Sequence, residues 1–404
     1  MLTRRSFLTT ATATTLASPL AIPAFAQQLK SRKSEAKPIS QQERDGRIER
    51  ARQLMTAEKI DAVVIAGGTT LRYFTGVRWG NSERLFAFVL PRKGDPFYIS
   101  PAFEEDRARE QAGDKVRVLT WHEDEDPSVL VGAGLNMRTA RVGMEEKVPF
   151  AFSDAIARAN PGLTLTGANM VTGVCRARKT QAELDLMKLA NSVTLEAYRA
   201  AWKQVKEGMT NRDVSALIEA AYVQLGFPGV VSVQVGENAA NPHGSARPQV
   251  IREGSLVMMD DGCQVEGYQS DITRTVVLGK PTDKMKKVFD IVHRAQTAAL
   301  AAAKPGAACE SVDIAARKVI TDAGFGPGYT YFTHRLGHGI GMDGHEWPYL
   351  VRGNKLPLQP GMTFSDEPGV YIRGEFGVRL EDDMYITENG AELFTPQATS
   401  LETI

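Results

Sequence analysis

Residues 334–348 read HRLGHGIGMDGHEWP and hold His334, His338 and His345, three of the six histidines in the chain. The glycines between them carry no side-chain bulk, so the backbone can come close to a bound ligand. A chain with few histidines that gathers three of them in a glycine-rich stretch is expected to use them. This stretch therefore predicts one part of a functional site.

Two aspartates upstream form the next part of that site. Asp260 ends the apolar run 256–259, and Asp271 lies in YQSDITRTVVL, residues 268–278. These stretches predict two strands of a hairpin, with a turn near Glu266-Gly267. Opposite side chains in a hairpin have Cβ atoms ~5 Å apart, so the two carboxylates should lie within about one or two rungs. Carboxylates that close repel each other unless a proton or a cation lies between them, which favours a cation site.

Two glutamates follow in short motifs. Glu367 precedes a Pro-Gly turn in SDEPGVY, and Arg379 and Glu381 lie two positions apart in VRLEDD. Residues two apart on a strand face the same side, so this arginine and this glutamate should be neighbours. A lone acid before a turn is usually solvated. Glu367 becomes a candidate ligand only as a member of the whole set.

The complete set resembles the pita-bread (M24) metallopeptidase family, which includes methionine aminopeptidase, aminopeptidase P and prolidase. The resemblance rests on DDG, SDITRT, GHGIG, DEPGVY and VRLEDD, in that chain order, within residues 178–404. The family's metal ligands run Asp, Asp, His, Glu, Glu. The resemblance therefore implies five ligands here, namely Asp260, Asp271, His338, Glu367 and Glu381.

The same resemblance implies catalytic helpers, which are His243, His334, His345, Glu367, Tyr371 and Arg379. Of the histidines, His243 and His345 would donate to the substrate or intermediate, and His334 would stand at the mouth of the site. Glu367 would act as general acid and base. Arg379 would orient Glu381 or a neighbouring carboxylate, and Tyr371 would hydrogen-bond near the metals.

The donor chemistry agrees with a two-metal centre. Four carboxylates balance the charge of two divalent cations, and one histidine among oxygen ligands makes a fairly hard set. Mn²⁺ or Co²⁺ is favoured, and Zn²⁺ or Fe²⁺ also suits the set. Two ions ~3.5–4 Å apart can share a water and lower its pKa towards neutrality. The resulting hydroxide would attack a peptide carbonyl, and a metal would stabilise the oxyanion.

The 404 residues suit two domains. Residues 43–172 alternate between apolar runs and helical patterns, which predicts an α/β domain. Strands are expected at 61–65, 85–90, 96–99 and 115–119, and helices at 104–111 and 153–160. This domain resembles the creatinase-like domain that precedes the catalytic domain of prolidases and aminopeptidase P.

Residues 173–404 are expected to form the pita-bread catalytic domain, beginning with a long helix over 181–206. Residues 206–227 and 304–325 each begin K-x-G, end G-F and read as a helix that stops at glycine. This repeat predicts two similar α/β halves facing each other. The expected fold class is thus α/β (α+β) throughout, with the site between the halves.

The N-terminus reads as an export signal over residues 1–26. Arg4-Arg5 precedes a modest apolar run that ends in Ala24-Phe25-Ala26, as in a twin-arginine signal with its cleavage site. Residues 27–42 are polar and are expected to form a flexible linker. We therefore expect a periplasmic or exported protein. No other stretch is apolar for about 18 residues, so no membrane span is expected.

Composition excludes some partners. Lys plus Arg and Asp plus Glu both number 48, so no basic excess attracts nucleic acid. The resemblance implies a homodimer, in which Trp79 of one subunit could overhang the site of another or could be an ordinary core residue.

The expected reaction is hydrolysis of peptides with proline in second position, as an Xaa-Pro dipeptidase. The alternative is an aminopeptidase P-type enzyme acting on longer peptides. The two differ in whether a group pairs with the substrate's terminal carboxylate, and Arg335 and Arg352 are candidates. The overall length and residues 334–348 resemble those of prolidases, and this resemblance favours the dipeptidase. Creatinase or lyase chemistry on this fold, or a binding role, is disfavoured because all five ligands remain.

Overall fold

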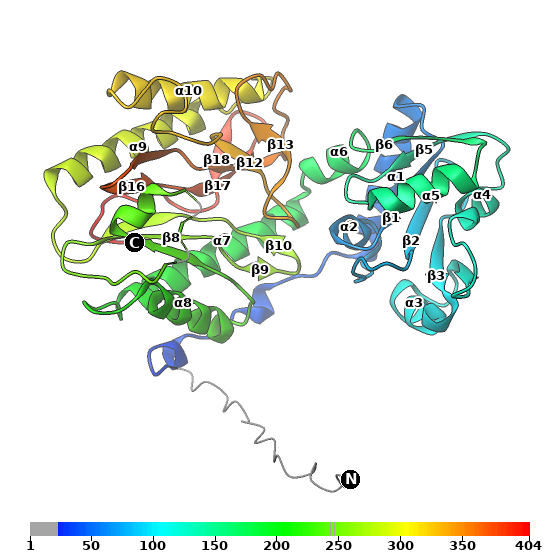
Figure 1. The fold of residues 1–404 in the computed structure, drawn as a ribbon, viewed down its shortest axis with the longest axis horizontal. Helices are drawn as coiled ribbons and strands as arrows, with labels where there is room; N and C mark the ends of the chain where they lie inside the picture. The colour runs from blue at the N-terminus through cyan, green and yellow to red at the C-terminus, as the bar shows by residue number, and fades with distance from the viewer. Residues whose placement is uncertain (1–22, 243, 246) are drawn as a thin grey trace, which may run out of the picture.

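The computed structural model describes residues 23–242, 244–245 and 247–404. Most of the expected export signal, including Arg4-Arg5, lies outside the described residues, and so does His243. The chain forms an N-terminal and a C-terminal domain, which are joined through α6 (Thr172–Ala177) and α7 (Gln181–Trp202) (Figure 1). No helix among the residues described has the length and apolar character needed to cross a membrane.

The N-terminal domain is built on one mixed sheet in the order β4-β3-β2-β1-β5-β6. Its strands are β1 (Ala62–Ala66), β2 (Ala87–Pro91), β3 (Phe97–Pro101), β4 (Arg117–Trp121), β5 (Ala140–Met144) and β6 (Leu163–Gly167). Its helices are α1 (Gln41–Ala57), α2 (Thr69–Thr75), α3 (Glu105–Ala112), α4 (Val129–Leu135) and α5 (Phe150–Ala159).

Alternation along β1 explains why both faces of this sheet are covered. Val63 and Ile65 pack with α1 and α2, whereas Ala62 and Val64 pack with α4 and α5. Side chains on a strand point alternately to opposite faces, so a continuous apolar run serves two layers. The four expected strands and two expected helices are present within a few residues. The strands β5 and β6 and the helices α2 and α4 were not predicted, because they are short and contain glycine or polar residues.

The C-terminal domain has two helix pairs, as the repeat predicts. Its further helices are α8 (Asn211–Leu225), α9 (Asp283–Ala302) and α10 (Cys309–Asp322). A three-stranded sheet contains β7 (Ser232–Val235), β8 (Leu256–Asp260) and β11 (Arg274–Val277). A five-stranded sheet contains β12 (Gly337–Gly339), β13 (Glu346–Leu350), β14 (Thr363–Asp366), β17 (Asp382–Ile386) and β18 (Ala391–Leu393).

Two short ribbons complete this domain, β9 (Gln264–Val265) with β10 (Tyr268–Gln269), and β15 (Gly369–Ile372) with β16 (Phe376–Arg379). The strand β8 lies between the helix pairs, since Val257 and Met259 join the core around α7 and α8. Leu256 and Met258 join the core around α9 and α10. The expected arrangement of a creatinase-like domain followed by two facing α/β halves is confirmed.

The predicted hairpin carrying Asp260 and Asp271 is present but interrupted. Met259 pairs with Arg274 in the ladder between β8 and β11. The turn at Glu266-Gly267 has φ of 50° and 97°, which suits a tight hairpin turn. The aspartates lie where the ladder between β8 and β11 ends and the ribbon β9–β10 has not begun, so both carboxylates can face one hollow.

The expected flexible linker over residues 27–42 is wrong in the described structure. Short 3₁₀ turns at Ala26–Gln28 and Lys33–Glu35 lie before α1. The Arg32 amide donates to the Leu225 carbonyl at 2.9 Å, and its guanidinium donates to Ser192 at 3.0 Å. Polar composition suggested a solvated segment. Scattered apolar residues of this segment nevertheless pack against the core, namely Leu29, Ala36 and Ile39.

Candidate metal centre

The structure brings the five predicted ligands together from five separate places in the chain. Asp260 ends β8, Asp271 precedes β11, and His338 is in the middle of β12. Glu367 directly follows β14, and Glu381 lies between β16 and β17. These side chains line a cavity of about 500 Å³. The site is therefore assembled only by the tertiary fold.

Their donor atoms form two overlapping groups. The atoms of Asp260, Asp271 and Glu381 lie within 4.8 Å of one another, and so do those of His338, Glu367 and Glu381. Glu381 belongs to both groups. Two three-residue groups that share one carboxylate could together hold two cations.

His338 has the orientation of a metal ligand. Its Nδ1 lies 3.1 Å from the Gly339 carbonyl oxygen, so Nδ1 donates there and Nε2 keeps a lone pair. That Nε2 faces Glu367 Oε1 at 3.3 Å and Asp271 Oδ2 at 3.7 Å. Burial lowers the pKa of His338 to about 3, so the ring is neutral at pH 7. A neutral nitrogen that faces two carboxylate oxygens needs either a proton or a cation between them, and this geometry suits a metal ligand.

The buried carboxylates of the site also require compensating positive charge. Burial, and then the neighbouring carboxylates, raises the pKa of Asp271 and Glu381 well above the ordinary range. Burial also raises the pKa of Glu367 to about 8. Without cations, these groups would take up protons because their negative charges crowd a buried hollow. Two divalent ions would offset that crowding, so the residues present fit the metals that the family implies.

A hydroxyl that sequence reasoning missed links several of these groups. Thr273 Oγ1 lies 2.8 Å from Asp260 Oδ1 and 2.5 Å from Glu381 Oε2. It also accepts a hydrogen bond from Arg379 Nε at 2.9 Å. Thr273 lies within SDITRT, two residues after Asp271. Residues two apart on a strand face the same side, so this spacing could have predicted that Thr273 lies at the site.

Arg379 lies where it was expected, and its main partner is an aspartate. Its Nη2 donates to Asp260 Oδ2, whereas its Nε is 3.8 Å from Glu381 Oε2. Its Nη1 donates to the Tyr371 hydroxyl and to the Pro242 carbonyl, both at 3.1 Å. The guanidinium thus connects Asp260, Tyr371 and the segment just before His243.

Two of the other predicted helpers, His334 and His345, line the same cavity. His334 Nε2 lies 2.7 Å from the Tyr371 hydroxyl, and the His334 side chain is 21% exposed, as a residue at the mouth would be. The His345 ring stacks on His338 at 3.6 Å between centroids. His243 lies outside the described residues, so its expected position stays a prediction.

Trp79 and the candidate carboxylate-binding arginines take different places. Trp79 is 8% exposed and stacks on Phe86 at 3.9 Å, within the core of its own N-terminal domain. Arg335 lines the metal cavity and lies over the Tyr349 ring at 4.2 Å. Arg352 is exposed and is not among the residues that line the cavity.

Three acids next to the predicted ligands are deeply buried. They are Asp366, Asp382 and Asp383, each with 0% exposure. Arg274 donates to Asp382 at 2.5 Å, and the Asp271 amide donates to Asp383 at 2.9 Å. These contacts fix the backbone on either side of the site.

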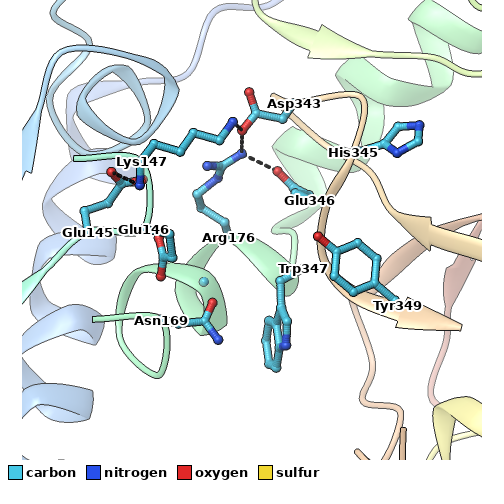
Figure 2. A pocket seen from close by; sticks show the side chains of 11 residues that line it. Glu145, Glu146, Lys147, Asn169, Arg176, Asp343, His345, Glu346, Trp347 and Tyr349 are labelled. Atoms are coloured by element: carbon cyan, nitrogen blue, oxygen red, sulfur yellow. Dashed lines mark hydrogen bonds and ion pairs between the residues drawn. The ribbon is translucent and has the colours of Figure 1, made fainter. Parts of the chain in front are cut away.

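A second pocket of about 290 Å³ lies beside the metal cavity and shares His345 with it (Figure 2). Here Arg176 donates to Asp343 at 2.7 Å and also to Glu346, and both acids lie within two residues of His345. Lys179 donates to Glu346 at 2.6 Å, and Lys147 of the N-terminal domain donates to Asp343 at 2.5 Å. This interdomain network was not predicted. It holds the loop that carries His345 against the N-terminal domain.

Comparison with known proteins gives matches over both domains. Residues 185–388 match the family described as Metallopeptidase family M24, and residues 47–178 match the Creatinase/Prolidase N-terminal domain. The Xaa-Pro dipeptidase of Lactobacillus delbrueckii subsp. lactis is 35% identical over 357 residues, covering 85% of this chain and 95% of that protein.

Solved structures agree. The dipeptidase PepE from Mycobacterium ulcerans superposes with a TM-score of 0.86 at 34% identity, covering 91% of this chain and 99% of that one. The prolidase from Thermococcus sibiricus superposes with a TM-score of 0.81 at 31% identity, covering 89% and 99%.

Proposed function

The chain belongs to metallopeptidase family M24 and is a metallopeptidase, and from that premise we propose that it is a two-metal Xaa-Pro dipeptidase. The observation that carries the proposal is the pair of ligand groups that share Glu381, with a neutral His338 facing carboxylate oxygens. The metals would be held by Asp260, Asp271, His338, Glu367 and Glu381. The ligand set favours Mn²⁺ or Co²⁺ and also suits Zn²⁺ or Fe²⁺.

Bound ions would supply Lewis acidity, which lowers the pKa of an attacking water and polarises the scissile carbonyl. The chain's own residues would direct the rest of the reaction. Glu367 would accept the proton of the attacking water and return it to the leaving amine. Arg379 would hold Asp260 in place, and Thr273 would hold Glu381. His345, stacked on His338 at the cavity wall, would donate a hydrogen bond to the substrate.

The dipeptide preference is proposed from Arg335. Its guanidinium lies in the wall of the cavity and over the Tyr349 ring, and it contributes to the lowered pKa of His338. An arginine fork matches a carboxylate with two parallel hydrogen bonds. Arg335 could thus pair with the terminal carboxylate that a dipeptide presents next to its scissile bond. A longer peptide, the substrate of the aminopeptidase P-type alternative, would place an amide there instead.

The test compares an Xaa-Pro dipeptide with the matching Xaa-Pro-Xaa tripeptide, using protein loaded with Mn²⁺ or Co²⁺. We expect proline release from the dipeptide and about tenfold or more lower kcat/KM on the tripeptide. Arg335→Gln should raise KM for the dipeptide, whereas the exposed Arg352→Gln should not. Faster cleavage of the tripeptide would favour the aminopeptidase alternative. If no Xaa-Pro peptide is hydrolysed, both the Xaa-Pro dipeptidase proposal and its aminopeptidase alternative are refuted.

We also propose export through the N-terminal signal and assembly as a homodimer. The support for export is Arg4-Arg5 followed by Ala24-Phe25-Ala26. The support for a dimer is the family resemblance alone.

A further inference from the structure

Four arginines, here called the arginine cluster, line a small cavity between the two domains. They are Arg44 of α1, Arg47 of α1, Arg72 of α2 and Arg78 just beyond α2. The catalytic domain closes the cavity with Glu266 and Tyr268, at the turn between β9 and β10. Figure 1 shows α2 on the side of its domain that faces this ribbon. The cavity volume is about 50 Å³.

Among the residues that the structure describes, only Arg47 of this cluster has an anionic partner at ion-pair distance. Arg47 lies 3.3 Å from Glu183 Oε1, and it also donates to the Tyr73 carbonyl at 2.7 Å and to the Tyr268 hydroxyl at 2.9 Å. Arg72 donates to the backbone carbonyl of Glu266 at 2.8 Å. In the part of the chain that the structure describes, no salt bridge joins Arg44, Arg72 or Arg78 to a carboxylate. The four arginines outnumber the nearby carboxylates of Glu183 and Glu266, so the cavity carries excess positive charge.

Two N–H groups of the cluster are buried without a partner. Arg47 is 4% exposed, and its Nε makes no hydrogen bond among the described residues. The Nε of Arg44 is likewise shielded from solvent and makes no hydrogen bond among the described residues. Leaving a buried donor unsatisfied costs free energy. Burial, and then the charge of Arg78, lowers the pKa of Arg72, whereas the nearby charge of Glu266 opposes this shift.

We propose that this cavity binds a small tetrahedral oxyanion, such as sulfate or phosphate, between the domains. Guanidinium groups recognise oxyanions through paired charge-assisted hydrogen bonds, and unpartnered N–H donors here supply them. The small volume suits one inorganic ion and leaves no room for a peptide. A bound anion would contact both α1–α2 and the β9–β10 turn, so it would fasten the N-terminal domain to the catalytic domain away from the metal cavity.

The chain offers a matched experiment because Arg44 and Arg78 have no ion pairs to lose. The wild type, Arg44→Gln/Arg78→Gln and the control Arg138→Gln are compared as full-length, metal-loaded protein. Arg138 is exposed and distant from the cavity. Thermal unfolding and calorimetric titration use millimolar sodium sulfate or sodium phosphate, each against sodium chloride at equal ionic strength. Circular dichroism checks that every variant is folded.

We expect saturable stabilisation of the wild type and of Arg138→Gln by sulfate or phosphate beyond that of chloride. The double variant should bind the oxyanion about tenfold or more weakly. In oxyanion-free buffer it should be at least as stable as the wild type, because a repulsion has been removed. A wild type that responds equally to chloride and to both oxyanions would overturn the proposal. So would a double variant that keeps the full oxyanion response.

Discussion

Substituting Arg176 with Met should cost the protein about 2–3 kcal/mol of stability, because it breaks the centre of the interdomain network. The Arg176 and Glu346 side chains are 8% and 6% exposed. Removing one partner of a buried ion pair typically costs about 3–5 kcal/mol, since a buried charge is left behind. Here Lys179 still pairs with Glu346, and Lys147 still pairs with Asp343, which places the cost below that range.

The assay is urea unfolding of metal-loaded protein at neutral pH, with Arg158→Met as the matched control. Arg158 pairs with Asp154 at 2.8 Å, but both are exposed, at 74% and 43%. An exposed helical pair of this kind is worth about 0.3–0.5 kcal/mol. Arg176→Lys should recover part of the loss. Equal destabilisation by Arg176→Met and Arg158→Met would refute the reasoning.

The network should also make this difference depend on pH. Burial opposes ionisation of Asp343, yet the Arg176 guanidinium holds the pKa of that carboxyl below its usual range. Burial likewise opposes ionisation of Glu346, and Lys179 and Arg176 lower its pKa. A carboxyl whose pKa is depressed by folding stabilises the protein above its unfolded pKa. That contribution is lost as pH falls through the folded pKa. The difference in free energy of unfolding between the wild type and Arg176→Met should therefore become smaller at acidic pH.

Three further predictions concern the metal centre. His338→Ala should abolish uptake of two metals, measured by elemental analysis of dialysed protein; two ions per chain in the variant would contradict the assignment. Thr273→Val should lower metal affinity or kcat roughly 10–100-fold, since it removes a contact shared by three site residues, whereas Thr297→Val on the exposed side of α9 should change neither. In metal-free protein the folded pKa of Glu367 is about 8, which lies above its ordinary value of 4.5. The melting temperature of metal-free protein should therefore fall as pH rises from about 4.5 to 8, whereas that of metal-loaded protein should not. Parallel pH profiles of the two forms would contradict this prediction.

Sequence reasoning predicted which side chains converge on one cavity, because each of the five predicted ligands sits in a short motif of its own. The motif order implied which acids and which histidine would converge, and the apolar run before Asp260 placed that aspartate at the end of a buried strand. Helix ends were predicted less well. The helix expected over 181–206 ends earlier, at Trp202. Its end was placed too late because polar residues such as Gln204 and Lys206 fit a helical sequence pattern as well as a turn.

Contacts between distant segments could not be predicted in this way. Arg176 and Glu346 are 170 positions apart, and Arg32 and Glu196 are 164 apart. Before the fold is known, each is only one charged residue among many. The arginine cluster was hidden for the same reason, because its members join the β9–β10 turn only when the domains dock.

The scattered origin of the predicted ligands would turn bound metal ions into cross-links. Arg379 and Asp260, which meet beside the proposed metals, are 119 positions apart and come from opposite halves of the catalytic domain. Ions held there would tie the halves together much as a disulfide closes a long loop, and would add their binding free energy to folding. No short stretch of the nascent chain could hold them. Loading must then follow folding, which is the order that proposed export of an already folded protein would need.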